Sequence, residues 1–200
     1  MLSEDTKFVA LHEHYNDTFS NIKESIKLRD KLLALVLFVL VFVVLYAFWP
    51  NDAVNTLTQI ATQKMGATLN FSDSFLGSML WFSLLVVIVR YTQTVIYIER
   101  QYLYIHKLEE DLHKNYKNSV AFTREGKSYL EKYPIYSDWV CSLYTIIFPA
   151  VLSLIVLIKI ISEWALISKA NLLSLLLNTS IAIFILLSIV LYMMFMHKQK

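Results

Sequence analysis

The sequence FLGSMLWFSLLVVIVRYTQTVIYI, residues 75–98, is apolar over most of its length and contains one charged residue, Arg90. A helix needs about 20 such residues to cross the hydrocarbon of a bilayer. Further blocks of this kind occupy residues 32–49, 139–161 and 172–196. Because a backbone in lipid must satisfy its own hydrogen bonds, such blocks favour helices. The chain is therefore predicted to be an all-α polytopic membrane protein with four transmembrane helices.

The composition argues against a soluble enzyme. The chain is 56% hydrophobic, with three Gly and three Pro in 200 residues. Four spans leave about half of it in polar segments, which are too divided for a conventional enzyme core. No Ser/His/Asp or Cys/His arrangement suited to nucleophilic catalysis is visible, and alternating strand patterns typical of a membrane barrel are absent. We predict that the protein is not an enzyme and uses no cofactor.

The basic residues lie mostly on one side of the predicted membrane. Five precede the first span: Lys7, Lys23, Lys27, Arg29 and Lys31. Seven lie in the segment between the second and third spans: Arg100, Lys107, Lys114, Lys117, Arg124, Lys127 and Lys132. The opposite loops contain Lys64 and Lys169. The positive-inside rule then places both termini and the middle segment in the cytoplasm.

This topology divides the chain into four parts. Residues 1–31 are predicted to form a cytoplasmic amphipathic helix, and residues 32–98 the first transmembrane hairpin with its outer loop. Residues 99–138 form a small helical cytoplasmic segment, and residues 139–200 a second transmembrane hairpin with a short tail. The apolar face of the N-terminal helix recurs at the helical period: Phe8, Leu11, Tyr15, Phe19, Ile22 and Ile26. This helix either lies on the inner leaflet or the middle segment, or bundles with its copies in an oligomer.

Individual helices have further signals. From Phe75 to about Tyr116 no Pro interrupts the helical pattern, which predicts a helix of roughly 60 Å that continues beyond the membrane. Pro149 is expected to kink the third span, since it lacks a backbone donor. Lys159 and Glu163 are expected to form an i,i+4 pair near the outer edge of that span. A short helix is also expected in the outer loop, with these residues on one face: Val54, Leu57, Ala61 and Met65.

Arg90 is the most costly residue in the predicted membrane. Its position, fifteen residues after Phe75, is about 22 Å along the helix. It either extends its side chain to the inner headgroups or faces a water-filled pore or a neighbouring subunit. Gln93, Thr94 and Tyr97 follow on the same helix and are candidate pore residues together with Arg90.

The middle segment contains a local basic and aromatic cluster. Its candidate ligand-binding residues are Lys114, Lys117, Arg124, Lys127 and Lys132. Tyr116, Phe122, Tyr129 and Tyr133 are interleaved with them. Basic groups bind phosphates and aromatic faces stack on bases, so the cluster suits a nucleotide or an oligonucleotide. The alternative is attraction to anionic lipid headgroups.

Two other patterns are set aside. His106, Glu110 and His113 share one helical face, but a fourth metal ligand is not evident, and solvated charge is the simpler interpretation. The sequence from Ala121 to Ser128 ends like a phosphate loop, yet it lacks the first Gly and a preceding strand. We therefore predict neither a metal site nor NTP hydrolysis.

The segments Leu11–Tyr15, Ile22–Asp30 and Phe122–Leu130 occur in a small chain with four spans and a helical N-terminus. This organisation resembles the membrane effectors of bacterial anti-phage systems, in particular the effector of the Hailong system. The resemblance implies an oligomeric ion channel, a tetramer, in the bacterial inner membrane. It also implies a gate formed by N-terminal helices, for which Phe8, Leu11 and Tyr15 are candidates, and closure by nucleic-acid oligomers made by a partner nucleotidyltransferase.

Two functions are therefore weighed. The first is a homo-oligomeric ion-channel effector of anti-phage defence, surrounded by membrane lipid and gated from the cytoplasm by a nucleotide or oligonucleotide. The second is a non-conducting membrane adaptor or regulator that presents its cytoplasmic helices to a partner protein. Ion flux through liposomes distinguishes them.

Overall fold

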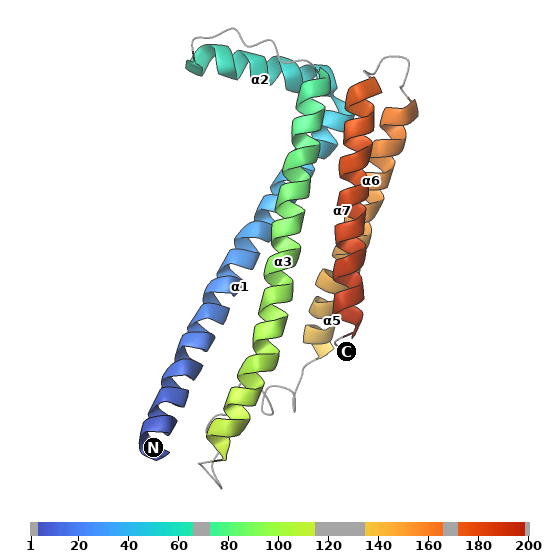
Figure 1. Ribbon diagram of the computed structural model, residues 1–200. Helices are drawn as coiled ribbons and strands as arrows, with labels where there is room; N and C mark the ends of the chain where they lie inside the picture. Colours follow the sequence, from blue (N-terminus) through green and yellow to red (C-terminus); the bar gives the residue numbers. More distant parts are fainter. Residues whose placement is uncertain (1–3, 66–72, 115–134, 166–171, 199–200) are drawn as a thin grey trace. The chain divides into compact units, whose positions relative to one another are not determined.

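Helices account for nearly all of the computed structural model, which describes residues 4–65, 73–114, 135–165 and 172–198 (Figure 1). Within these residues, four helical stretches are long and apolar enough to cross a membrane. They contain the four apolar blocks of the sequence. The all-α, multi-pass membrane architecture predicted from the sequence is confirmed to this extent.

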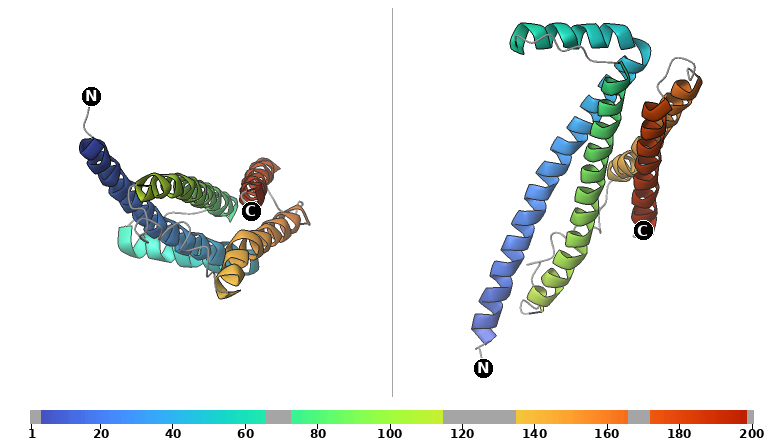
Figure 2. Two further views of the ribbon diagram at one scale, coloured as in Figure 1. Left: turned by 90° about the horizontal axis from the view of Figure 1, so that it is seen from below. Right: turned by 45° about the horizontal axis from the view of Figure 1, so that its top comes forward.

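Helix α1 runs without a break from Glu4 to Phe48 and includes both the N-terminal segment and the first apolar block. The amide of Trp49 still donates to the carbonyl of Leu45, at 2.9 Å. Helix α2, Pro50–Met65, then forms the short helix expected in the loop. A proline suits a first helical turn, because its missing N–H has no partner within the helix there. Figure 1 and the right view of Figure 2 show α2 running across the direction of α1.

Helix α3, Asp73–His113, contains 41 residues. At 1.5 Å per residue it is roughly 60 Å long, so the predicted extension beyond the apolar block is confirmed. It ends three residues before the expected Tyr116, which lies outside the described residues. The turn predicted at Asn115–Ser119 and the short helix predicted to reach Tyr133 also lie outside them.

The third apolar block is interrupted by a wider turn. Helix α5 covers Ile135–Ser142, a π-helical turn covers Leu143–Ile147, and helix α6 covers Phe148–Ala165. In a regular α-helix, Pro149 would lack the donor for the carbonyl of Thr145, and its ring would press on that carbonyl. A π turn placed just before the proline relieves this conflict. The sequence predicted a kink at Pro149, and the structure has a π-helical turn directly before it.

Helix α7, Leu172–Lys198, completes the chain and ends with two basic residues in its last turn, where the helix dipole favours positive charge. Helices α6 and α7 lie side by side in both views (Figures 1 and 2). The loop that connects them lies outside the described residues.

The chain comprises two compact units. Unit 1 combines Met1–Lys31 with Gln93–Tyr144, and unit 2 combines Leu32–Thr92 with Thr145–Lys200. Within unit 1, apolar side chains of α1 and α3 are fully buried: Ile22, Ile105 and Leu112. Within unit 2, the largest buried side chains come from α1, α3, α6 and α7: Val36, Trp81, Leu84, Ile88, Val156, Leu175 and Ile185. All four apolar helices therefore contribute to the core of unit 2.

Hydroxyl side chains in the apolar helices donate back to their own backbone. Thr92 donates to the carbonyls of Ile88 and Val89, both at 3.0 Å. Others bond to the carbonyl four residues earlier: Ser153, Ser162, Thr179, Ser180 and Ser188. A bond of this kind satisfies the hydroxyl donor within its own helix, so the hydroxyl needs no acceptor on another helix.

Gly77 permits a close approach between α1 and α3 in unit 2. A Cβ atom at this position would lie 3.3 Å from Cε1 and from the hydroxyl of Tyr46. Gly77 itself is buried. Small residues at helix contacts in membranes serve this purpose, because they let two backbones approach.

We predict that Gly77→Leu lowers the stability of the detergent-solubilised protein by about 1–3 kcal/mol, the usual cost of overpacking a close contact. Thermal unfolding measures the change. Ser180→Leu is the matched control, because Ser180 is exposed on α7 and added bulk there meets no core. Adding Tyr46→Ala should recover part of the loss. A Gly77→Leu variant as stable as the control would show that the close approach is not a constraint.

Candidate functional site

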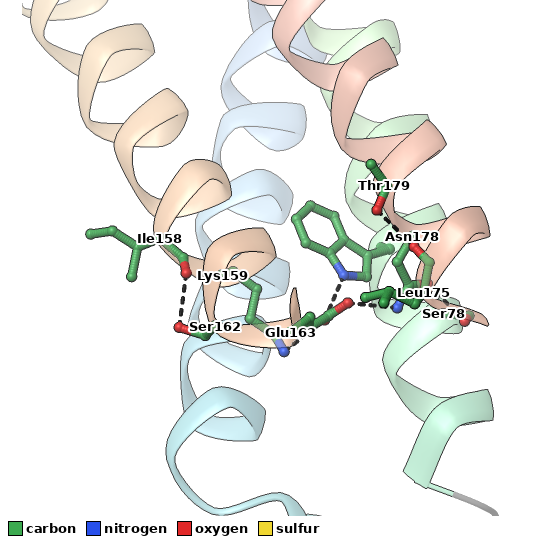
Figure 3. Close-up of polar contacts among 9 residues, drawn as sticks. Ser78, Ile158, Lys159, Ser162, Glu163, Leu175, Asn178 and Thr179 are labelled. Carbon is green, nitrogen blue, oxygen red and sulfur yellow. Dashed lines mark hydrogen bonds and ion pairs between the residues drawn. The ribbon is translucent and has the colours of Figure 1, made fainter. Parts of the chain in front are cut away.

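The carboxylate of Glu163, on α6, is the centre of a polar cluster in unit 2 (Figure 3). Its Oε1 lies 2.8 Å from Nζ of Lys159 and accepts a hydrogen bond of 2.9 Å from the Trp81 indole. Its Oε2 accepts one of 2.9 Å from the Asn178 amide. The amide oxygen of Asn178 in turn accepts a bond of 2.8 Å from Ser78. We call these five residues, from α3, α6 and α7, the polar clamp.

The polar clamp is largely shielded from its surroundings. The side chains of Lys159 and Glu163 are 12% and 15% exposed, while Trp81 is 1% and Asn178 5% exposed. Lys159 also lies 5.3 Å from the centre of the Tyr46 ring, a cation–π contact that brings α1 to the same level. A buried carboxylate is tolerated when its charge is paired and its oxygens accept hydrogen bonds. Glu163 meets both conditions.

A second polar link joins α6 and α7 beside the clamp. The indole of Trp164 donates to the Thr179 hydroxyl at 3.0 Å, and that hydroxyl donates to the carbonyl of Leu175 at 2.7 Å. Ser162 bonds only locally, to the carbonyl of Ile158 at 2.9 Å. Two hydrogen-bonded contacts therefore hold the adjoining ends of these helices together.

Sequence spacing predicted part of this cluster. The i,i+4 pair of Lys159 and Glu163 is confirmed. The partners of Glu163 on other helices, Trp81 and Asn178, were not predicted, because periodicity along one helix does not indicate which helix lies opposite. The available signal was an amide inside the fourth apolar block, Asn178, and a carboxylate just past the end of the third, Glu163, since each needs a partner in or near lipid.

A small apolar pocket lies between the four apolar helices of unit 2. On α3 it begins two turns after the clamp residue Trp81, at Ile88. Its lining residues are Val36, Ile88, Tyr91, Thr92, Phe148, Pro149, Leu152, Ile189 and Tyr192. The rings of Tyr91 and Phe148 meet edge to face, with centroids 6.0 Å apart. The pocket includes Pro149, directly after the π turn.

In unit 1, the N-terminal part of α1 contacts the extension of α3. Tyr15 donates a hydrogen bond of 3.0 Å to Glu109, whose side chain is buried, with 2% exposure. One residue earlier on α1, the His14 ring lies 2.8 Å from the hydroxyl of Tyr104, which is five residues before Glu109 on α3. Phe8 and Leu11, predicted with Tyr15 as gate residues, are half-buried on α1. Of these three, only Tyr15 has a hydrogen bond to α3 among the contacts described here.

The predicted pore residues share much of one helix face. Arg90, Gln93 and Tyr97 are exposed and are spaced by three and four residues along α3. Thr94 is offset from them and half-buried. The exposed positions before Arg90 on this face are apolar: Phe75, Met79, Phe82 and Val86. The exposed face therefore changes from apolar to polar at Arg90.

One of the predicted ligand-binding residues is described. Lys114 is exposed and donates a hydrogen bond of 2.6 Å to Asp111. This bond and the negative charge of Asp111, with a smaller contribution from Glu110, raise the pKa of the Lys114 ammonium group. It therefore remains charged at neutral pH. Lys117, Arg124, Lys127 and Lys132 lie outside the described residues.

Metal coordination receives no support from the described parts of the chain, in which no group of three or more His, Cys, Asp or Glu residues could hold an ion. Nε2 of His106 is buried without a hydrogen-bond partner. Its ring instead lies 6.2 Å from that of Tyr102.

Comparison of the chain with protein-family models, curated proteins and solved structures gives no match.

We predict that Glu163→Gln destabilises the protein by about 3–5 kcal/mol, because it keeps the shape of the side chain but leaves Lys159 as a buried charge without its anion. Thermal unfolding in detergent measures the loss. Ser162→Ala, a neighbouring change of an exposed residue with only a local hydrogen bond, should have little effect.

A second substitution separates charge from shape. Lys159→Met added to Glu163→Gln removes the unpaired ammonium group and should restore much of the stability. Equal losses in the single and double variants would contradict the assignment of this ion pair as the cause.

Proposed function

We propose that the protein is a homo-oligomeric membrane ion channel, gated from the cytoplasm by a nucleotide or oligonucleotide, that acts as an effector in anti-phage defence. The observation that supports conduction is the exposed polar face of α3 formed by Arg90, Gln93 and Tyr97. The defence context and the nature of the ligand are suggested by the resemblance to the Hailong effector.

The polar face favours an oligomer because of where it begins. Arg90 lies within the candidate span Ser74–His113 and is exposed on the single chain. A charged residue that faces lipid is costly, whereas one that faces a water-filled path is not. A ring of subunits, a tetramer by the resemblance, would bring one α3 from each copy to a shared axis. A ring of arginines would then favour anions at that level.

The proposed orientation places both termini and the middle segment in the cytoplasm, following the distribution of Lys and Arg in the sequence. Residues 4–31 are then a cytoplasmic amphipathic helix at the gate. Because they belong to the same uninterrupted helix as the first apolar block, displacement of one would act directly on the other. The contact between Tyr15 and Glu109 is a candidate restraint on that displacement.

The ligand would bind the basic and aromatic cluster of the middle segment. Lys114 fits this role in part, since it is exposed and charged, although Asp111 shares its ammonium group. A ligand gates the channel only if it binds the open and closed states with different affinity. A partner nucleotidyltransferase would supply it, and a gene for such an enzyme next to this one would support the proposal.

A non-conducting adaptor is the second candidate. The helix contact in unit 1 favours it, because Tyr15 and His14 of α1 tie that helix to α3 and leave charged side chains of α3 exposed, such as Lys107 and Glu110. Such a surface suits a protein partner. An adaptor needs no polar path through the membrane.

We predict ion flux when the purified oligomer is reconstituted in liposomes, and a lower anion-to-cation permeability ratio for Arg90→Gln. Reversal potentials across a planar bilayer measure the ratio. Arg100→Gln is the matched control, because Arg100 is exposed on the same helix beyond the apolar block. A verified oligomer that conducts no ions, with or without oligonucleotides, would count against the channel and for the adaptor.

For the ligand, we predict that the double variant Arg124→Glu, Lys127→Glu binds oligonucleotides more weakly and with a flatter salt dependence. The slope of log K against log salt is negative, and each lost phosphate contact makes it less negative by about 0.7 for a single strand. Fluorescence anisotropy at several salt concentrations measures this. Lys107→Glu, on α3 outside the cluster, is the control. Unchanged binding in the double variant would remove the middle segment from the proposed site.

A further inference from the structure

Three lysines form a ridge on the exposed face of α1 in unit 1. Lys23, Lys27 and Lys31 are all exposed and follow one another at intervals of four residues, which is about 6 Å along the helix. Side chains four residues apart lie on the same helix face. The Lys23 ammonium lies 4.3 Å from the centre of the Phe19 ring. We call the three lysines the lysine ridge.

Two acidic residues that accompany the ridge in unit 1 are engaged by Arg29. The guanidinium of Arg29 donates hydrogen bonds of 3.0 and 2.8 Å to Asp30. Glu99 of α3 lies close enough to Arg29 for their opposite charges to attract. Neither Lys27 nor Lys31 forms an ion pair or a hydrogen bond with a residue that the structure describes. Their charge is therefore open to a partner from outside the chain.

The ridge lies at the edge of the predicted membrane. The first apolar block begins at residue 32, directly after Lys31, and the second ends at residue 98, directly before Glu99. Because Arg29 and Glu99 attract each other, these two block ends lie at one level of α1 and α3. Such a level marks the border of the hydrocarbon, where the headgroups of phospholipids begin.

The helix face that bears the ridge continues as an apolar surface. Ala34, Phe38 and Phe42 follow Lys31 at the helical spacing of three and four residues, and all three are exposed. The rings of Phe38 and Phe42 meet edge to face, with centroids 4.8 Å apart. One face of an uninterrupted helix thus offers aromatic surface within the apolar block and ammonium groups at its border.

A phospholipid with a negative headgroup matches this face in both charge and polarity. Its acyl chains suit the two phenylalanines, and the flexible stem of a lysine lets the ammonium group reach the headgroup level. Glu24, also exposed, is three residues before Lys27 and leaves the ridge with a surplus of positive charge. A zwitterionic lipid brings its own cation and gains less from that surplus. A nucleic acid would use the charge but not the apolar surface beyond it.

We propose that the lysine ridge binds an anionic phospholipid, whose phosphate lies between Lys27 and Lys31 and whose chains lie along Phe38 and Phe42. This goes beyond the proposed function, because it applies whether or not the protein conducts ions and in either orientation. It also separates the roles of the basic residues at this level. Arg29 pairs within the protein, and the ridge lysines pair with lipid.

Lipid titration of the full chain tests the site. The protein in detergent is titrated with phosphatidylglycerol or with phosphatidylcholine, and native mass spectrometry measures the bound fraction. We expect tighter binding of phosphatidylglycerol. The double variant Lys27→Gln, Lys31→Gln should bind it roughly 30-fold more weakly, at about fivefold for each lysine, and should bind phosphatidylcholine as before. Both positions are exposed and Gln is a good helix former, so we expect the variant to fold.

Two further variants separate the ridge from net charge. Lys7→Gln with Lys107→Gln is the matched control, because it removes the same charge from exposed positions of unit 1 outside the ridge. It should leave the affinity for phosphatidylglycerol nearly unchanged, since salt screens charges over distances beyond about 10 Å. Lys27→Arg with Lys31→Arg keeps both charges and should keep the lipid preference.

The position of the lipid is measured with a phosphatidylglycerol that has a photoactivatable diazirine in one acyl chain. We expect cross-links on α1 between residues 34 and 42. Equal affinity for the two lipids in the unmodified protein would overturn the site. Equal losses in the Gln double variant and the matched control would overturn it too, as would cross-links confined to other helices.

Competition distinguishes the possible sources of phosphate. Inorganic phosphate and a short oligothymidylate are added to the protein with bound phosphatidylglycerol, and neither should displace it. Displacement by either one would assign the ridge to a soluble phosphate ligand and overturn the lipid site. Lipid binding is measured without ion flux, so failure of this inference and failure of the proposed channel are separate results.

Discussion

A polar group inside hydrocarbon has no water to bind, and this constraint accounts for most of the structure. It requires every backbone amide in the apolar blocks to find a partner within its own helix. It also explains why hydroxyl side chains such as Thr92 and Ser153 donate back to their own helices. The carboxylate of Glu163 only accepts hydrogen bonds, and the backbone of its own helix cannot supply enough donors for it. Its partners therefore come from three helices, α3, α6 and α7.

The location of these partners gives the four apolar helices of unit 2 an uneven character along their length. At one level, charge pairing and hydrogen bonds specify which helices are neighbours and at what register. At the other, Pro149 excludes regular hydrogen bonding and the surrounding side chains leave a small apolar gap.

Unit 1 also contains a buried carboxylate that is hydrogen-bonded by a neighbouring helix. Glu109 is buried beside apolar residues of α3, and Tyr15 supplies a hydrogen bond from α1. Because α1 and α3 each continue from unit 1 into unit 2, the helices that form this contact are also two of the apolar helices. Any partner or ligand that alters the contact in unit 1 therefore acts on helices that belong to both units.

Much of the fold could be predicted from the sequence, because length and apolarity are local properties of a segment. The four apolar helices, the extension of α3, the short helix α2 and the pair of Lys159 with Glu163 depend on spacing along one chain. Less of the candidate site could be predicted from the sequence. The ligand-binding residues were selected by local charge, and only Lys114 among them has a described environment. Arg90, Gln93 and Tyr97 were grouped by position on one helix, and the structure adds that this face is exposed.

The sequence by itself therefore determined that this chain is helical and able to cross a membrane four times. A single hydrophobic block in lipid can satisfy all of its backbone hydrogen bonds by itself only as a helix. Only the tertiary structure decided which polar side chains meet: Trp81, Glu163 and Asn178 belong to three different helices and come together through the packing of those helices. It also decided that the effect of Pro149 is a π turn beside a pocket. Contacts between helices depend on how their surfaces fit, and periodicity along a single helix contains no information about the opposite surface.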